Sequence, residues 1–309
     1  MTHLIMDKKL FDCIISHVHS KCPNKRKPKY TSEYYLTNIL DVLVDFVKWS
    51  SLKKSKNYNG KNRYHYKTIA DIHKLWSDSG VYKSAYEELV QKKNITTAKK
   101  NIIELLIDST LIINKTGIEC IGYGSESRKK KFTKLSALSN IDGKNVAISV
   151  DAIKTKERLV DPLNKYEKNR KNKKNNDPNI VLVKKYIPTL SHDVKNVEPI
   201  IETIKPILNG IGNKIKIKMF GDKGYVMKCD DKKTIKKKYN VKMVHSMRTN
   251  QKMKNTKNEE ISLSKRYRIE HMFEKIKVYN RIHVRRDKTI NCYMGFVYLG
   301  CIMKFGISD

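Results

Sequence analysis

Three acidic residues lie where a folded chain can bring them to one site. Asp108 lies in a nearly continuous apolar run from Ile102 to Ile113, which is typical of a buried strand that carries one acid near its end. Asp222 directly follows the alternating apolar stretch Ile215 to Phe220, and Glu270 lies in a late helical segment. Three carboxylates at one sheet edge suit two divalent cations, which activate the attacking oxygen and stabilise the leaving oxygen in phosphoryl transfer.

The ligand types at this expected site favour a hard cation. Neither a cysteine cluster nor a histidine cluster lies near Asp108, Asp222 or Glu270 in the sequence, so no softer metal is indicated. We therefore predict Mg²⁺, with Mn²⁺ able to substitute for it. For each acid taken alone, a helix cap or a salt bridge explains a carboxylate at that position equally well.

The segment from Arg266 to Lys277 predicts the helix that carries the third acid. Its apolar residues recur at the i, i+3, i+4, i+7 spacing of an amphipathic helix: Ile269, Met272, Phe273 and Ile276. Arg266 lies four residues before Glu270 and Lys277 lies seven after it, so the carboxylate belongs to a stripe of cations. This arrangement suits a metal held beside a nucleic-acid phosphate, and a solvated face with i, i+4 ion pairs is the alternative.

The charge of the chain points to a polyanionic partner. Its 309 residues include 65 Lys and Arg against 31 Asp and Glu, a formal net charge of +34. The basic residues are spread along the chain instead of lining one amphipathic helix, which favours nucleic acid over a membrane surface. The codon bias of an AT-rich genome is an alternative source of Lys, although it does not by itself force this excess over Asp and Glu.

The cysteines indicate reduced thiols inside a cell. Six are present without a CxxC pair, and the sequence shows no signal peptide, so we expect a protein that is not secreted. One N-terminal group could hold zinc, but its spacing fits no standard finger and no second ligand pair follows it: Cys13, His17, His19 and Cys22. The apolar run from Cys292 to Met303 is too short to span a bilayer and predicts a buried terminal helix.

Changes in periodicity divide the chain into two parts. Residues 1–98 predict a basic, mostly helical region for DNA binding or dimerisation, in which Ser79-Gly80 separates two apolar segments. A helix-turn-helix reader and plain three-helix packing both fit that pattern. Residues 99–309 predict an α/β catalytic domain, a mixed sheet flanked by helices. Within it, residues 154–178 are rich in Lys and Asn and predict a mobile insertion that is solvated or faces DNA.

Further elements of the second part have recognisable boundaries. A hairpin is predicted over residues 131–153 around an Asp142-Gly143 turn, followed by a strand over residues 180–187. His192-Asp193 begins a helix, and a Lys-rich helix and a short strand from Val241 to His245 come later. Strand and helix alternation of this kind places helices on both faces of the sheet.

The motifs around the three acids resemble those of insertion-sequence transposases of the DDE superfamily, whose third acid lies in a Tyr-x2-Arg-x3-Glu-x6-Lys signature. Arg266, Glu270 and Lys277 match it position by position, and Leu263 stands where the signature has Tyr. Shorter matches cover about residues 100–300: Asp108-Ser109-Thr110, Asn114-Lys115-x-Gly117, Lys134-Leu135-Ser136, His192-Asp193 and Gly221-Asp222-Lys223-Gly224-Tyr225.

The resemblance implies an RNase H-like catalytic fold that cleaves DNA ends and transfers strands without a covalent protein–DNA intermediate. The implied metal ligands are Asp108, Asp222 and Glu270, and the implied DNA contacts are Lys223, Arg266, Lys277 and Arg281. Gly224 would let the backbone turn sharply after the second acid. The partner is double-stranded DNA, held by a homodimer in the synaptic complex, and the protein would act where DNA is: a nucleoid, a nucleus or a viral factory.

Two other functions fit the same motifs. A structure-selective or guide-dependent nuclease could share the fold and the metals, and it would hydrolyse DNA without joining it. A domesticated transposase that only binds DNA is the second alternative, although all three acids are present.

Overall fold

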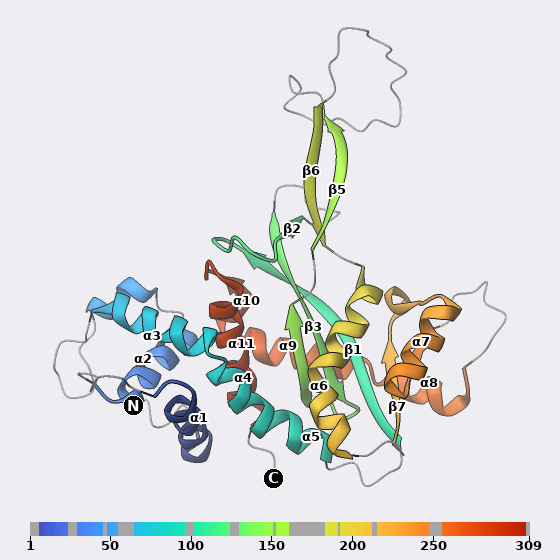
Figure 1. Cartoon of the computed structure of the whole chain (residues 1–309), viewed down its shortest axis with the longest axis horizontal. Coiled ribbons are helices and arrows are strands. Elements are labelled where there is room, and N and C mark those ends of the chain that lie inside the picture. Colours follow the sequence, from blue (N-terminus) through green and yellow to red (C-terminus); the bar gives the residue numbers. More distant parts are fainter. Residues whose placement is uncertain are drawn as a thin grey trace.

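The computed structural model describes most of the chain, and every structural statement below concerns these residues. They are 6–23, 30–45, 48–54, 65–96, 102–123, 130–150, 153–160, 183–190, 192–211, 215–246 and 255–306, with the backbone alone for 153–160 and 183–190. The N-terminal helices α1 to α4 lie at one end of a central sheet, and α7 with α8 lies at the other (Figure 1).

The central sheet is mixed. Its middle strands are, in spatial order, β4 (Asn145–Val150), β3 (Lys131–Asn140), β1 (Ile102–Asn114), β7 (Lys216–Gly221) and β8 (Val241–His245). β7 and β8 run parallel to β1, whereas β3 is antiparallel to both β1 and β4. The predicted α/β class and mixed sheet are therefore confirmed. β1 continues eight residues beyond Leu106, its last residue paired with β7, so Asp108 lies in the middle of its strand and the prediction that it lies near the strand end is wrong.

A tight turn joins β3 to β4, as the sequence predicts. Gly143 has φ +80°, a backbone conformation that residues with a side chain rarely adopt, and its N–H donates to the Asn140 carbonyl at 2.9 Å. The Asn140 side chain caps the same turn by accepting from the Asp142 and Lys144 backbone N–H groups.

Four further strands extend the sheet. β2 (Gly122–Tyr123) pairs with β3, β6 (Val183–Leu190) pairs with β2, β5 (Ile153–Val160) is antiparallel to β6, and β9 (Val284–Arg285) is parallel to β1. The prediction of a mobile insertion over 154–178 is wrong for residues 154–160, because they form the regular strand β5. The remainder of that segment lies outside the described residues.

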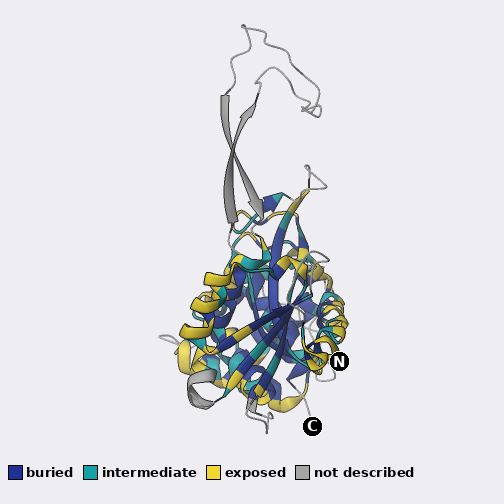
Figure 2. Cartoon of the chain, turned by 90° about the vertical axis from the view of Figure 1, so that its right-hand side faces the viewer, coloured by how far each residue is buried: buried dark blue, intermediate teal, exposed yellow. Residues whose placement is uncertain are grey.

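Alternating side chains of the sheet face two separate hydrophobic clusters. Leu105 and Ile107 of β1 face the cluster that contains α6 (Val197–Ile211), whereas Leu106 faces the cluster that contains α9 (Tyr267–Lys277) and α11 (Ile290–Phe305). Figure 2 shows this layering, with buried strands inside and exposed residues on the outer helix surfaces. Helices therefore cover both faces of the sheet.

The described N-terminal residues are helical, as predicted. The elements are α1 (Lys8–Lys21), α2 (Ser32–Val44), η2 (Trp49–Lys54), α3 (Tyr66–Asp78), α4 (Val81–Tyr86), the π-helical turn η3 (Glu87–Gln91) and α5 (Lys92–Thr96). α3 and α4 meet at Gly80, which has φ +71°, and both pack against α11. Such burial agrees with the packing alternative for this helix pair. Buried residues of α1 to α4 belong to the same cluster as α9 and α11, so the core continues across residues 98 and 99, and the domain boundary there stays a prediction.

The C-terminal helices α10 (Asn280–His283) and α11 form part of the core. Sixteen residues make up α11, most of them buried, which confirms the predicted terminal helix, and no helix in the described part of the chain has both the length and the apolar character of a membrane span. The remaining helices are α7 (Cys229–Tyr239) and α8 (Lys257–Ser264).

A buried ion pair follows α10. Arg281 Nη2 lies 2.7 Å from Asp287 Oδ1, and both side chains are about 5% exposed or less. The Arg281 guanidinium also lies over the rings of Trp49 and Phe296, at 5.7 and 5.1 Å from their centres. Because this burial keeps Arg281 from solvent, the structure does not support its predicted contact with DNA, and we do not assign it to DNA below.

Breaking this pair should destabilise the fold strongly. We expect Asp287→Ala to lower the free energy of unfolding by about 3–5 kcal/mol, because it leaves the Arg281 charge buried without its partner. Urea denaturation measures the change. The matched control is Lys83→Ala, which removes an exposed pair with Glu87 at 3.8 Å and should cost less than about 1 kcal/mol. Equal losses of unfolding free energy in the two variants would contradict the conclusion that burial makes the Arg281–Asp287 pair costly to break.

Candidate active site

Parallel pairing places Asp108 and Asp222 side by side. In the register of β1 and β7, Leu106 lies opposite Phe220, and each acid follows two residues later, Asp108 within β1 and Asp222 directly after the end of β7. Neighbouring strands are about 4.8 Å apart, and side chains two residues apart point to the same face. Leu106 and Phe220 both belong to the cluster that contains α9, so the two acids point towards that helix.

Helix α9 brings the third acid to the same edge. Its buried residues anchor it across β1 and β3, as the sequence predicts: Ile269, Met272, Phe273 and Ile276. Arg266 Nη2, one turn before Glu270, lies 3.7 Å from Asp108 Oδ2 and 4.0 Å from Glu270 Oε1. The Glu270 side chain is 61% exposed, whereas Asp108 is 18% exposed. Arg266 therefore joins Asp108 to Glu270, and Asp222 is close enough for its charge to act on Asp108.

Asp108 has an unusual electrostatic environment. Its pKa is raised to about 6, chiefly by burial and in smaller part by the negative charges of Asp222 and Glu270, whereas the backbone N–H of Ser109 and the charge of Arg266 act to lower it. The Ser109 N–H donates to Asp108 Oδ1 at 2.7 Å. The ionised form of a buried carboxylate beside two other acids is strongly stabilised when a cation binds next to it.

The donor set at this edge consists of carboxylate oxygens, which fits Mg²⁺ or Mn²⁺. Within the described part of the chain, however, the oxygens of Asp108, Asp222 and Glu270 do not all lie within 4.8 Å of one another.

The turn after β7 fixes the second acid. Asp222 Oδ1 accepts from the Gly224 N–H at 2.7 Å at the start of η6 (Lys223–Tyr225). A Cβ atom on Gly224 would lie 2.9 Å from both Asp222 Oδ1 and Asp193 Oδ2. Gly224 does not have a positive φ, so the expectation that glycine is needed here to let the backbone turn sharply is wrong. Glycine is needed because two carboxylates approach its Cα closely.

Asp193 is a fourth acid at this edge to which sequence analysis assigned no role. Its Oδ1 accepts from Lys134 Nζ at 2.6 Å and from Ser109 Oγ at 2.5 Å. Burial alone would raise its pKa, but these two hydrogen bonds outweigh burial and lower it. The motifs around His192-Asp193 and Lys134 were the available signals, and only the fold shows that they meet.

Two predicted phosphate contacts also lie near the acids. Lys277 Nζ donates to Thr110 Oγ1, two residues beyond Asp108 on β1, and burial lowers the pKa of this lysine. Lys223 is exposed and directly follows Asp222. Arg266, Lys277 and Lys223 thus surround the three acids, whereas Arg281 lies in the core.

Comparison with known proteins points to transposases over a short stretch. No protein-family model matches the chain. Over 38 residues, 12% of this chain and 29% of the relative, it is 50% identical to a putative transposase for insertion sequence element IS6501 from Brucella ovis. The match therefore spans less than a third of that relative.

One solved structure resembles the chain weakly. The cryo-EM structure of a piggyBac transposase synaptic complex with hairpin DNA aligns with 98% of this chain and 72% of that chain. Its sequence identity is 10% and its TM-score is 0.47, too low to support a conclusion.

The raised pKa of Asp108 predicts a measurable change in stability without metal. Its pKa moves from 3.8 to about 6, so the folded protein holds this proton more tightly than the unfolded chain does. That contribution to stability is complete below the unfolded value and is lost as the pH rises through the folded value. In EDTA at pH 8 we expect the permanently neutral Asp108→Asn to raise the free energy of unfolding by about 1–3 kcal/mol.

Thermal and urea unfolding at pH 8 and pH 4 measure this difference, which should nearly vanish at pH 4. The exposed acid Asp12 on α1 provides the control, and Asp12→Asn should change little at either pH. If Asp108→Asn instead has a lower free energy of unfolding than the parent at pH 8, the folded protein stabilises the ionised carboxylate, and the raised pKa is contradicted.

Proposed function

We propose that this protein is a DNA transposase of the DDE superfamily, which cleaves the ends of a mobile element and joins them to target DNA. The observation that carries the proposal is the parallel pairing of β1 with β7, which extends to two residues before Asp108 and Asp222, together with Arg266, which contacts both Asp108 and Glu270. The stretch of 38 residues that is 50% identical to an insertion-sequence transposase supports the same activity.

An RNase H-like catalytic fold is part of this proposal. Its support is the antiparallel run of β4, β3 and β1, followed by the parallel strands β7 and β8 with helices on both faces. In this topology the first acid lies within β1, the second directly follows the neighbouring strand β7, and a late helix supplies the third.

Each acid and cation has a distinct role in the proposed reaction. Asp108, Asp222 and Glu270 would hold Mg²⁺, which supplies activation of water or a DNA 3′-OH and stabilisation of the leaving oxygen. In the metal-free protein Arg266 partly neutralises Asp108 and Glu270. Once cations balance the acids, Arg266 can pair with a DNA phosphate, together with Lys223 and Lys277.

The remaining properties follow from the substrate. A net charge of +34 suits double-stranded DNA, and the affinity should fall steeply with salt because each neutralised phosphate releases counterions. Two DNA ends must be handled together, so we propose a homodimer in the synaptic complex. The protein would act wherever the DNA of its host or element lies.

Replacing either Asp108 or Asp222 should abolish DNA cleavage and preserve DNA binding. We expect Asp108→Asn and Asp222→Asn to reduce Mg²⁺-dependent cleavage of DNA carrying the gene's own flanking sequences by about a hundredfold or more. Binding measured by mobility shift should change little, since the cations that neutralise phosphates remain. The exposed acid Asp231 on α7 gives the control Asp231→Asn, which should cleave normally.

The products of this assay test the function itself. Joined products in the parent protein support transposition, whereas hydrolysis without joining would indicate a nuclease. Binding without any cleavage would indicate a DNA-binding protein. Near-parental cleavage by either acid variant would contradict the assignment of that acid.

Glu270 and Glu274 provide a matched pair on one helix face. Glu270 shares Arg266 with Asp108, whereas Glu274 is exposed and its charge raises the pKa of Lys277. We expect Glu270→Gln to remove both hydrolysis and strand transfer in Mg²⁺, and Glu274→Gln to keep most of both. A pre-nicked end substrate separates the two steps, and the opposite ranking would make Glu274 the third ligand.

A further inference from the structure

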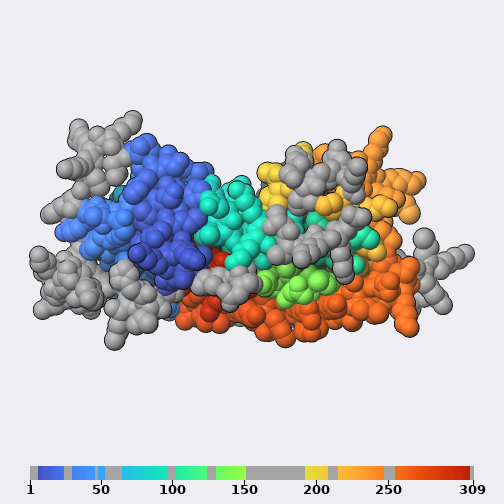
Figure 3. All heavy atoms as spheres, turned by 90° about the horizontal axis from the view of Figure 1, so that it is seen from below, coloured from blue at the N-terminus to red at the C-terminus, as the bar shows by residue number. Residues whose placement is uncertain are grey.

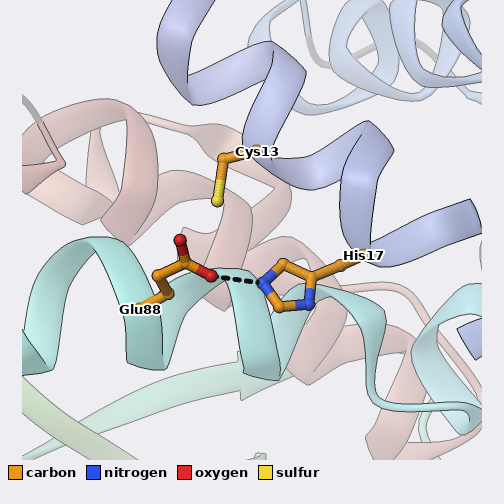
Figure 4. Close-up of side chains that lie close together, drawn as sticks. All are labelled: Cys13, His17 and Glu88. Atoms are coloured by element: carbon orange, nitrogen blue, oxygen red, sulfur yellow. Dashed lines mark hydrogen bonds and ion pairs between the residues drawn. The ribbon is translucent and has the colours of Figure 1, made fainter. Parts of the chain in front are cut away.

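A second group of metal-binding side chains lies between α1 and η3. Cys13 and His17 are four residues apart on α1, so they share one helix face. Glu88 reaches the same point from η3, and Figure 4 shows the three side chains converging. Their donor atoms all lie within 4.8 Å of one another, and His17 Nε2 lies 2.9 Å from Glu88 Oε2.

Tertiary packing supplies the ligand that the sequence spacing lacks. α1 packs against α4, and α4 continues directly into the π-helical turn that carries Glu88. Figure 3 shows the N-terminal residues lying against the segment around residues 80–100. Glu88 is 71 residues from His17 in sequence, so no local motif joins them.

We propose that Cys13, His17 and Glu88 bind a zinc ion that ties α1 to η3. Sulfur, imidazole and carboxylate are all established zinc ligands, whereas Mg²⁺ avoids thiolate. Zinc bonds of about 2.0–2.3 Å place tetrahedral donors roughly 3.3–3.8 Å apart. The observed donor separations, 2.9 Å between His17 and Glu88 and at most 4.8 Å for the others, bracket that spacing, and three protein donors leave a coordination position for water.

The charges around the cluster suit a cation. Burial, with a smaller effect from the negative charge of Glu88, raises the pKa of the Cys13 thiol to about 11, so the thiol keeps its proton in the metal-free protein. A bound divalent ion reverses this preference, and the thiol proton passes to solvent as the sulfur–metal bond forms. His17 is 20% exposed and Glu88 is 54% exposed, so an ion can enter from solvent.

The site has no residue in common with the three acids, and its role is structural. η3 continues through α5 towards β1, so the ion would fasten the N-terminal helix to the chain segment that leads into the catalytic sheet. The alternative is a plain His17–Glu88 hydrogen bond beside an inert cysteine, and that arrangement binds no metal.

Spectroscopy with Co²⁺ tests the proposal on the full chain. Excess Mg²⁺ occupies oxygen-ligand sites, and Co²⁺ is then titrated in. We expect a thiolate-to-cobalt charge-transfer band together with the visible bands of four-coordinate Co²⁺, both displaced by Zn²⁺. Loss of a residue that hydrogen-bonds a metal ligand costs about 10–100-fold in metal affinity. Loss of a ligand itself should cost at least as much, so we expect Cys13→Ser, His17→Gln and Glu88→Gln each to weaken Co²⁺ binding by about tenfold or more.

Each variant has a control on the same element. The control variants are Cys22→Ser, His19→Gln and Glu87→Gln. Cys22 and the exposed His19 lie near the end of α1, and Glu87 is next to Glu88. All three variants should bind Co²⁺ like the parent. Zn²⁺ should raise the melting temperature of the parent and the controls over that in EDTA, and not that of the three ligand variants.

Two results would overturn the site. One is the absence of a charge-transfer band in the parent, and the other is an undiminished band in Cys13→Ser. Because Glu88 is exposed, Glu88→Gln keeps the fold and still tests the proposal if Cys13→Ser does not fold. If Glu88→Gln binds Co²⁺ as tightly as the parent does, Glu88 is not a ligand and the proposed site is wrong.

Discussion

The parallel pairing of β1 with β7 is the constraint on which the candidate site depends. Side chains alternate along a strand, so a shift of one residue in this register would turn Asp222 to the opposite face from Asp108. The register is held because Leu106 and Phe220 must both reach the cluster beneath α9. Burial of apolar groups thus sets the separation of the charges, and α9 uses the same cluster to position Arg266 and Glu270.

Two acids at the site differ in how completely their charges are compensated. Asp193 accepts from Lys134 and Ser109, and its pKa is lowered, so it is already satisfied inside the protein. Asp108 has a raised pKa despite Arg266 and Ser109. The first pattern is that of a structural acid, which joins β1, β3 and the start of α6. The second is that of an acid whose partner comes from outside the chain.

Local periodicity made much of the fold predictable. The apolar runs predicted β1 and β7, helical spacing predicted α9, and Asp142-Gly143 predicted the turn between β3 and β4. Long-range contacts could not be read in this way. Sequence spacing gave no sign that Arg281 would be buried against Asp287, that Asp193 would meet Lys134, or that Glu88 would reach Cys13. The Lys content of β5 predicts disorder, so the sequence pattern does not indicate this strand.

The shared hydrophobic cluster also limits where the chain can be divided. Residues of α1 to α4 and residues of α9 and α11 belong to one cluster, so removing the N-terminal helices would expose Phe296, whose ring centre lies 4.2 Å from that of His73. A fragment that begins at residue 99 would therefore carry an uncovered apolar surface and tend to aggregate. The two predicted parts of the chain are expected to unfold together, as one cooperative unit.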